Sequence, residues 1–145
     1  MDEIDGFLSA VLPRQREAEI AILNGDPGPR TLLWSHNDPV TVLGADRNAN
    51  GWSEVEPLFD WLGSTFSNCE SSQFEVLAAG ASGDLGYVVG FERMTASVGG
   101  QAPVPFALRV TLIFRREDGE WKAVHRHADP MPGSHTVRDQ LATSE

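Results

Sequence analysis

The spacing of apolar residues changes once along this chain of 145 residues, from a helical period before Gln73 to alternation after it. Apolar residues spaced i, i+3, i+4 and i+7 share one face of a helix, whereas alternating apolar residues share one face of a strand. Helices that precede a run of antiparallel strands are typical of an α+β domain, in which the helices gather on one face of the sheet.

Three helices are expected in the first half. The first covers about residues 4–23, and Pro13 is expected to kink it or split it in two because proline lacks a backbone donor. A short second helix follows the pair Asp26-Pro27 and ends near Leu33. The third helix is expected to begin at Ser53, because residues 53–56 fit the capping-box pattern.

The second half is expected to form a sheet. Asp118-Gly119 favours a tight hairpin between the last two strands, because both residues adopt the positive φ angles that such a turn requires. The predicted strands, including one short strand before the third helix, are residues 39–44, 74–79, 85–98, 104–116 and 121–128.

Both faces of the strand over residues 104–116 carry apolar side chains. Val104, Phe106 and Leu108 begin a stripe on one face, and Ala107 and Ile113 lie on the other. If helices cover one face, the second is expected to be buried against a partner. We therefore predict a homodimer that forms through the sheet face.

Charge and hydropathy exclude two kinds of partner. The chain has 11 Lys and Arg against 21 Asp and Glu, a net charge of −10, so it lacks the basic surface that a nucleic-acid partner requires. No apolar run approaches the ~20 residues that cross a bilayer, so no membrane partner is expected. The opening residues 1–5 are acidic, unlike a secretory signal, and we predict a cytoplasmic protein.

No sequence motif indicates a cofactor. The chain contains no Walker loop, no Gly-x-Gly-x-x-Gly fingerprint and no Cys-x-x-Cys pair. Cys69 is the single cysteine, so it forms no disulfide within the chain, and we assign it no role. We predict no cofactor and no bound metal.

Three stretches resemble the SnoaL-like branch of the nuclear transport factor 2-like superfamily, also described as cystatin-like cone folds. They are Asp38 to Gly44, Arg109 to Thr111, and the hairpin from Phe114 to His127. The resemblance implies a single cone domain over residues 1–130, followed by a C-terminal tail over 131–145. In that fold, N-terminal helices pack on the concave face of a strongly curved, mainly antiparallel sheet and form a conical pocket.

Strand alternation proposes residues for the pocket wall. Tyr87, Phe91 and Arg93 share one face of their strand, and Arg109 and Thr111 share one face of the next. Two arginines in a pocket require a carboxylate partner or an anionic ligand, because an unpaired buried charge is very costly. The alternative is that Arg93 pairs at the sheet edge with an acid such as Glu75 or Glu92.

The loop before the short strand supplies further candidates. Trp34 and Trp52 adjoin predicted loops, where aromatic side chains suit the rim of a pocket for a flat, partly hydrophobic ligand. The resemblance implies that His36 and Asp38 lie near the pocket entrance. Asp38 is alternatively a turn residue that precedes Pro39.

His125 and His127 leave the same face of the last strand. This spacing fits a structural pair, a general acid and base, or a weak metal site without a third ligand. We take His127, His125 and Asp38 as the catalytic candidates.

The family resemblance and the pocket candidates together give three alternative functions. The chain binds a small, partly apolar molecule, anionic or carbonyl-containing, in the conical pocket. Alternatively, it is a cofactor-independent isomerase, cyclase or dehydratase that uses His and Asp acid-base chemistry, or a non-catalytic dimerisation domain. Known members of a shared fold do not decide between these functions.

Overall fold

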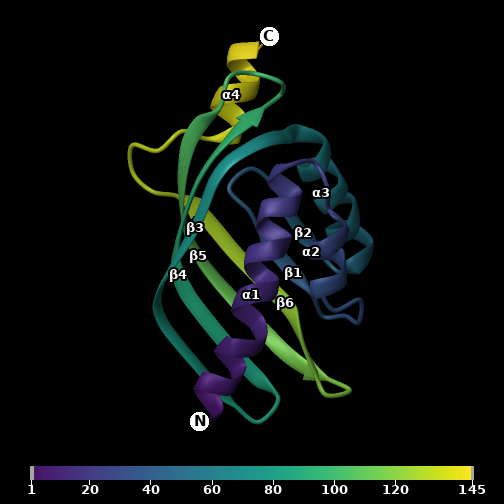
Figure 1. Cartoon of the computed structure of the whole chain (residues 1–145). Helices are drawn as coiled ribbons and strands as arrows, with labels where there is room; N and C mark the ends of the chain where they lie inside the picture. Colours follow the sequence, from purple (N-terminus) through teal and green to yellow (C-terminus); the bar gives the residue numbers. More distant parts are fainter. Residues whose placement is uncertain (1, 145) are drawn as a thin grey trace.

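The computed structural model describes residues 2–144 and has an α+β architecture (Figure 1). The helices are α1 (Glu3–Leu23), α2 (Gly28–Leu33), α3 (Trp52–Thr65) and α4 (Val137–Ser144). The strands are β1 (Thr41–Leu43), β2 (Asn48–Asn50), β3 (Phe66–Ser82), β4 (Leu85–Val98), β5 (Val104–Glu117) and β6 (Glu120–Pro130).

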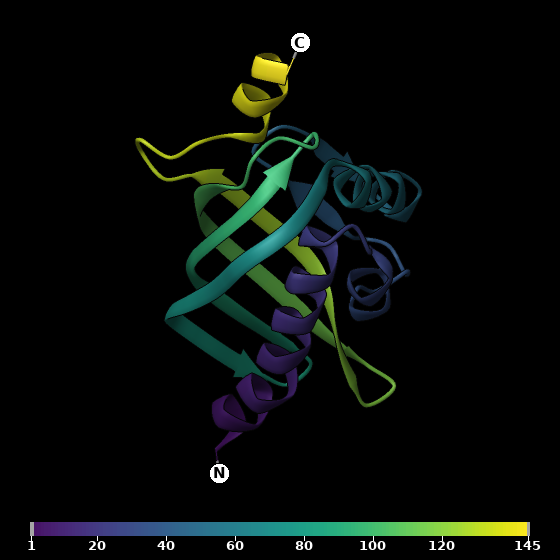
Figure 2. The same cartoon turned by 45° about the horizontal axis from the view of Figure 1, so that its top comes forward.

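The six strands form one sheet in the order β2-β1-β6-β5-β4-β3. All neighbours are antiparallel except β1 and β6, which run parallel. The sheet curves strongly around α1, and α2 and α3 lie beside α1 on the same side (Figures 1 and 2). The predicted fold class, with N-terminal helices on the concave face of a mainly antiparallel sheet, is therefore confirmed.

Helix α1 packs on the sheet through one apolar face. Phe7 and Val11 are fully buried, and the Phe7 ring makes edge-to-face contacts with Phe114 of β5 at 5.6 Å and Trp121 of β6 at 4.9 Å. Gly86 of β4 makes room for this ring, because a Cβ atom there would lie 2.6 Å from Phe7 Cε1. A glycine in a strand thus allows close helix-to-sheet packing.

The first two helices follow the sequence pattern with two exceptions. Pro13 lies inside α1, which remains one helix rather than two, and Asn24 caps its C-terminal end. Helix α2 begins one residue later than predicted, with Pro27 rather than Asp26 as its N-cap, and the Asp26 carboxylate accepts the Gly28 N–H at 2.9 Å.

The start of α3 differs from the predicted capping box. Ser53 lies inside the first turn of α3, and the N-cap is Gly51, at φ +88°. The capping acceptor comes from a distant loop, where Asp38 Oδ1 accepts the Trp52 N–H at 2.9 Å. A side chain outside the local sequence window replaces the predicted Ser53 cap.

The strands differ from the alternation mainly at β2 and β3. Strand β3 begins at Phe66 rather than residue 74, and β2 forms in a segment that its polar composition marks as a turn. The β5–β6 hairpin is confirmed, with Asp118 at φ +51° and Gly119 at φ +81°. The tail after β6 ends in the short helix α4.

Within residues 2–144, no helix combines the length and the hydrophobicity needed to cross a membrane.

We predict that Gly86→Ala destabilises the fold and Gly6→Ala does not. The Gly86 Cβ would overlap a ring held between two other aromatic rings, and such overpacking costs about 1–3 kcal/mol. Nothing lies within 4 Å of a Cβ at Gly6, inside α1, where alanine gains about 0.5–1 kcal/mol over glycine. Urea unfolding of both variants measures the difference, and equal stabilities would contradict this account of the α1–sheet contact.

Candidate functional site

A cavity of about 100 Å³ lies between the helices and the concave face of the sheet, next to the start of α4. Most of its wall is apolar, contributed by α1, α3 and the inner face of β4 and β5. The largest apolar side chains that line it are Leu23, Phe59, Trp61, Phe66, Met94 and Phe106.

The mouth of the cavity is formed by two segments. One is the β1–β2 turn, residues 44–47, and the other is residues 135–137 at the start of α4. The Arg47 guanidinium lies 3.8 Å from the centroid of the Trp61 ring, a cation–π contact that holds the turn against α3. The tail after β6 therefore completes the cavity wall.

Charged side chains form the inner end of the cavity. Glu19 of α1, Arg30 of α2 and Arg126 of β6 line it, and all three are buried. Arg30 donates a hydrogen bond to Glu19 from Nη2. Arg126 donates two hydrogen bonds to the fully buried Glu92 of β4, at 2.9 Å and 2.7 Å. We call Glu19, Arg30, Glu92 and Arg126 the buried charge cluster.

The pKa values of the two glutamates move in opposite directions. Burial raises the pKa of Glu19, and the negative charge of Glu92 raises it further against the attraction of Arg30. Burial also opposes the charge on Glu92, but the charge of Arg126 and its hydrogen bonds prevail and lower the pKa of Glu92. Glu19 is therefore the carboxylate of the cluster that accepts a proton more easily.

The pKa values of the two arginines also move in opposite directions. Burial lowers the pKa of Arg30, although Glu19 opposes this effect. Burial also acts against the charge on Arg126, but Glu92 outweighs it and raises the pKa of Arg126. The Glu92–Arg126 pair is thus the firmly ionised half of the cluster.

None of the four cluster residues was predicted to line the pocket, and Glu92, considered above as a partner of Arg93, pairs with Arg126 instead. The helical spacing of α1 does place Glu19 on the buried face of the helix. Glu19 lies four residues after Gln15 and three residues before Ile22, and both of these residues are buried. Glu92 and Arg126 likewise occupy the buried phase of their strands. A charged residue in a buried phase predicts a partner, but the partners lie on other elements and cannot be read from local spacing.

The five strand residues proposed for the pocket wall lie on the outer face of the sheet, away from the helices. Phe91 pairs in register with Arg109, while the neighbouring Val88 and Val110 are buried on the inner face. Tyr87, Arg93 and Thr111 follow the same outward phase as Phe91 and Arg109. Alternation assigned these residues to one shared face, but the helices cover the opposite one.

The two outer-face arginines pair with acids. Arg93 Nη1 lies 2.8 Å from Glu75 Oε1, which is the edge pairing left open above. Arg109 Nε lies 2.7 Å from Asp129 Oδ1. All four side chains are substantially exposed, so these pairs add little stability.

The histidine pair also lies on the outer face. His125 Nδ1 and Thr41 Oγ1 are 2.8 Å apart, and burial together with the nearby His127 lowers the pKa of His125. His127 is exposed. Among the described residues, no group of three or more His, Cys, Asp or Glu side chains is arranged to hold a metal ion.

The residues before and after the short strand that were predicted to lie at the pocket do not line the cavity, and they pack behind its wall instead. Trp34 is buried in the core and contacts Phe59 edge to face at 5.2 Å. The His36 ring stacks on Trp52 at 4.0 Å, with its Nε2 placed to donate to the Thr31 carbonyl at 2.8 Å. Asp38 caps α3, so these residues orient the helix that carries Phe59.

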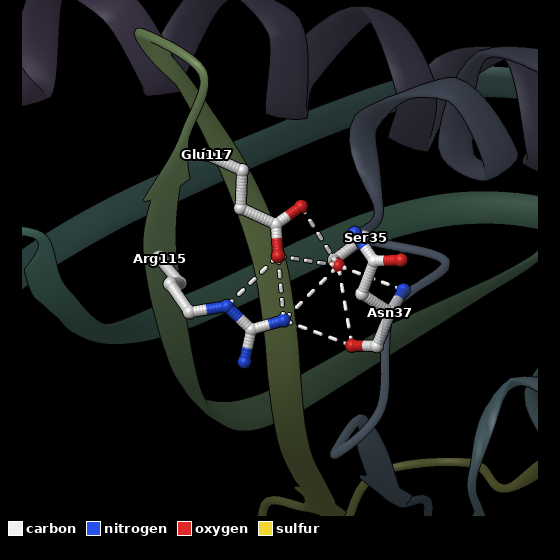
Figure 3. Close-up of polar contacts among 4 residues, drawn as sticks. All are labelled: Ser35, Asn37, Arg115 and Glu117. Carbon is white, nitrogen blue, oxygen red and sulfur yellow. Dashed lines mark hydrogen bonds and ion pairs between the residues drawn. The ribbon is translucent and has the colours of Figure 1, made fainter.

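A separate polar cluster ties this loop to the β5–β6 hairpin (Figure 3). The Ser35 hydroxyl lies 2.8 Å and 2.9 Å from the Glu117 carboxylate oxygens, and Arg115 Nη2 donates to the Asn37 carbonyl at 2.8 Å. Burial opposes the charge on Glu117, but hydrogen bonds from Arg115 and Ser35 lower its pKa. Since Ser35 is fully buried and accepts or donates to three other members of the cluster, the cluster fixes the loop against the hairpin.

A curved sheet that wraps N-terminal helices around a small internal cavity defines the cone class of α+β proteins. The model of the SnoaL-like domain matches residues 29–132, and the chain belongs to this family. The predicted membership is therefore confirmed. A comparison with curated proteins found no significant match.

Solved structures support the same fold. A candidate dehydratase of the nuclear transport factor 2-like family from Streptomyces avermitilis is 23% identical, with a TM-score of 0.69, over 88% of this chain and 97% of that one. A ketosteroid isomerase-like protein from Erwinia carotovora atroseptica is 15% identical, with a TM-score of 0.69, over 86% and 95%.

A third relative has a different kind of name. It is a candidate calcium/calmodulin-dependent protein kinase type II association domain from Thiobacillus denitrificans, 20% identical over 81% of this chain and 92% of that one, with a TM-score of 0.63. At these identities the likeness establishes the fold alone.

We predict that Arg126→Met destabilises the protein strongly and that adding Glu92→Leu restores stability. The single change removes the ion-pair partner and both arginine hydrogen bonds of the buried Glu92, and breaking such a pair costs about 3–5 kcal/mol. Replacing both partners by apolar residues removes that penalty. Chemical unfolding of both single variants and the double variant measures the coupling, and additive losses would contradict the proposed dependence of Glu92 on Arg126.

Proposed function

We propose that this protein binds a small molecule with an apolar body and a carboxylate or carbonyl group in the cavity between the helices and the sheet. The observation that carries the proposal is an apolar cavity that ends at buried ionised side chains. Apolar surroundings with a few convergent polar groups are the usual composition of a ligand site.

The size of the cavity limits the ligand. A cavity of about 150 Å³ accommodates benzene, whereas drug-sized ligands occupy about 300–1,000 Å³. The 100 Å³ here therefore suits an enclosed group no larger than about six non-hydrogen atoms. A steroid skeleton exceeds this volume. The proposed ligand is therefore smaller than the steroid that the name of one relative suggests as its substrate.

The charged end of the cavity supplies the polar contacts. The Arg30 guanidinium presents several N–H donors, and its planar shape suits a carboxylate or carbonyl oxygen. Leu23 and Phe59 would hold the apolar body of the ligand.

An acid-base enzyme that uses His125, His127 and Asp38 is less well supported. The two histidines lie on the outer face of the sheet, and Asp38 accepts a hydrogen bond from the start of α3. None of the three lines the cavity, and general acid-base catalysis needs hydrogen-bond reach to the substrate. Their placement therefore favours ligand binding over the isomerase, cyclase or dehydratase alternative.

We predict that small carboxylates or their primary amides raise the melting temperature. The probes are propionate, butyrate and isobutyrate, each with its amide, and a steroid serves as an oversized ligand. At about 100 times its dissociation constant, a ligand adds about 2.7 kcal/mol of stability. Thermal shift and titration calorimetry measure binding, and no response to any small probe would overturn the proposal.

A matched pair of variants locates the binding. Ala45 is exposed at the cavity mouth, and Ala45→Trp is expected to weaken binding at least about tenfold by obstructing access. Ala102 is exposed in the β4–β5 loop and lines none of the cavities described here, so Ala102→Trp is the control. Equal weakening by both variants would place the binding site elsewhere.

We further propose that the outer face of the sheet binds a second copy of the chain. Leu77 and Tyr87 are 52% and 45% exposed there, and Val89, Phe91 and Ile113 are half-buried between them. Exposed apolar side chains grouped on one face are typical of an interface. If the two-fold axis passes beside the Arg109–Asp129 pair, the pair of one copy lies against the same pair of the other and opposite charges meet.

We predict a dimer by size-exclusion chromatography with light scattering at micromolar concentration. Thr111→Glu, at the centre of the outer face, is expected to yield the monomer because it buries a carboxylate in the interface. Ser53→Glu, exposed on α3, adds the same charge away from the sheet and is expected to leave the dimer intact. A wild-type mass of 15.8 kDa would contradict the dimer.

A further inference from the structure

We propose that a monocarboxylate ligand replaces Glu19 as the partner of Arg30, and that Glu19 takes up one proton from solvent when the ligand binds. This inference rests on the proposed function and narrows its ligand to a carboxylate. It also gives Glu19 a role in binding as a proton acceptor.

The first step is charge balance. The buried charge cluster contains two carboxylates and two guanidinium groups, so its charges cancel when all four residues are ionised. A ligand carboxylate would add one negative charge beside buried groups. Because unbalanced buried charge is costly, one carboxylate of the cluster must be neutralised when the ligand enters.

The second step identifies Glu19 as that carboxylate. Glu92 is held by two hydrogen bonds from Arg126 and does not line the cavity, whereas Glu19 lines it and is paired with Arg30. Protonation of Glu19 weakens its ion pair and frees Arg30 for the ligand. The cluster then holds Arg30, Arg126, Glu92 and the ligand carboxylate, and its charges cancel again.

The third step is a route for the proton. A second cavity, of about 130 Å³, lies on the other side of Glu19 between α1 and β3. Its lining includes polar side chains, namely Gln15, Arg16, Ser72, Gln73 and Glu92. A water molecule needs only about 10–15 Å³ of such space and a few polar partners. Glu19 thus lies between the ligand cavity and a second cavity in which polar side chains, set among Leu12, Phe74 and Val76, offer hydrogen-bond partners to a water molecule.

The groups that face Glu19 agree with this role. Burial and the charge of Glu92 raise the pKa of Glu19, while Arg30 and Arg126 oppose the increase. Cys69 of β3 is a further titratable group near Glu19, and burial raises the pKa of its thiol, with the charge of Glu19 adding to the effect. The surroundings therefore favour the neutral form of Glu19 more than those of an exposed glutamate do.

Titration calorimetry with butyrate tests the inference. We expect an uptake of about one proton per butyrate at a pH where Glu19 is ionised, measured in buffers with different ionisation enthalpies. The affinity is expected to fall about tenfold per pH unit above the pKa of Glu19. Butyramide carries no charge and is expected to bind without proton uptake.

Glu19→Gln provides the matched variant. Glutamine mimics the protonated carboxyl, so the variant is expected to bind butyrate without proton uptake and with an affinity independent of pH. Glu75→Gln, which removes the same charge on the outer face, is expected to behave as wild type. Calorimetry of the wild-type protein with butyrate and butyramide gives the result even if Glu19→Gln fails to fold.

Stability without ligand gives an independent measure. A carboxyl whose pKa is raised by folding contributes stability below its unfolded pKa of about 4.3 and loses that contribution as the pH rises through the folded pKa. The unfolding free energy of the wild type relative to Glu19→Gln is therefore expected to decrease as the pH rises from the unfolded pKa of Glu19 through its higher folded pKa. A difference that is constant with pH would overturn the inference.

The outcomes separate the two proposals. Butyrate binding without proton uptake would overturn the inference about Glu19 and leave the proposed ligand site intact. Equal proton uptake with butyrate and butyramide would also overturn the inference. Failure of both probes, and of all others in the panel, to bind would overturn both proposals.

Discussion

The buried ion pairs Glu19–Arg30 and Glu92–Arg126 hold helix against helix and strand against strand around one cavity. They join α1 to α2 and β4 to β6 at the inner end of the cavity, where an error in position would leave a charge without a partner. Two well-paired charges contribute little net stability, but separating them is costly. The cluster therefore fixes the arrangement of four elements more than it increases the free energy of unfolding.

Much of the fold could be predicted from the sequence because its information is local. The bounds of β4 follow from alternation alone, and Asp118-Gly119 specifies the β5–β6 hairpin through its backbone angles. The predictions failed where the determining contact is distant. Asp38 caps α3 from fourteen residues away, so the nearby Ser53 pattern is misleading. The short β2 forms only because β1 pairs with it.

The candidate site was harder to predict, because alternation groups residues by face without saying which face the helices cover. Tyr87 and Arg109 share a face as predicted, yet it is the one opposite the helices. The charged residues that do line the cavity come from α1, α2 and β6, and no spacing rule joins positions 19, 30 and 126. Each of these residues is a charged residue at a buried position of its own helix or strand. The sequence can indicate that for each residue separately, but it does not indicate that the three residues meet.

Ion pairs that contribute little stability require another reason to stay buried. Apolar side chains of similar volume would fill the same space at equal or lower cost. Glu19, Arg30 and Arg126 instead line the cavity beside aromatic and aliphatic walls, where low polarity would strengthen every electrostatic contact with the proposed ligand. A titratable group with a displaced pKa in such a cavity is a recognised mark of a functional site. The outer-face histidines, which lack an enclosing wall, do not meet this criterion, and the inner end of the cavity does.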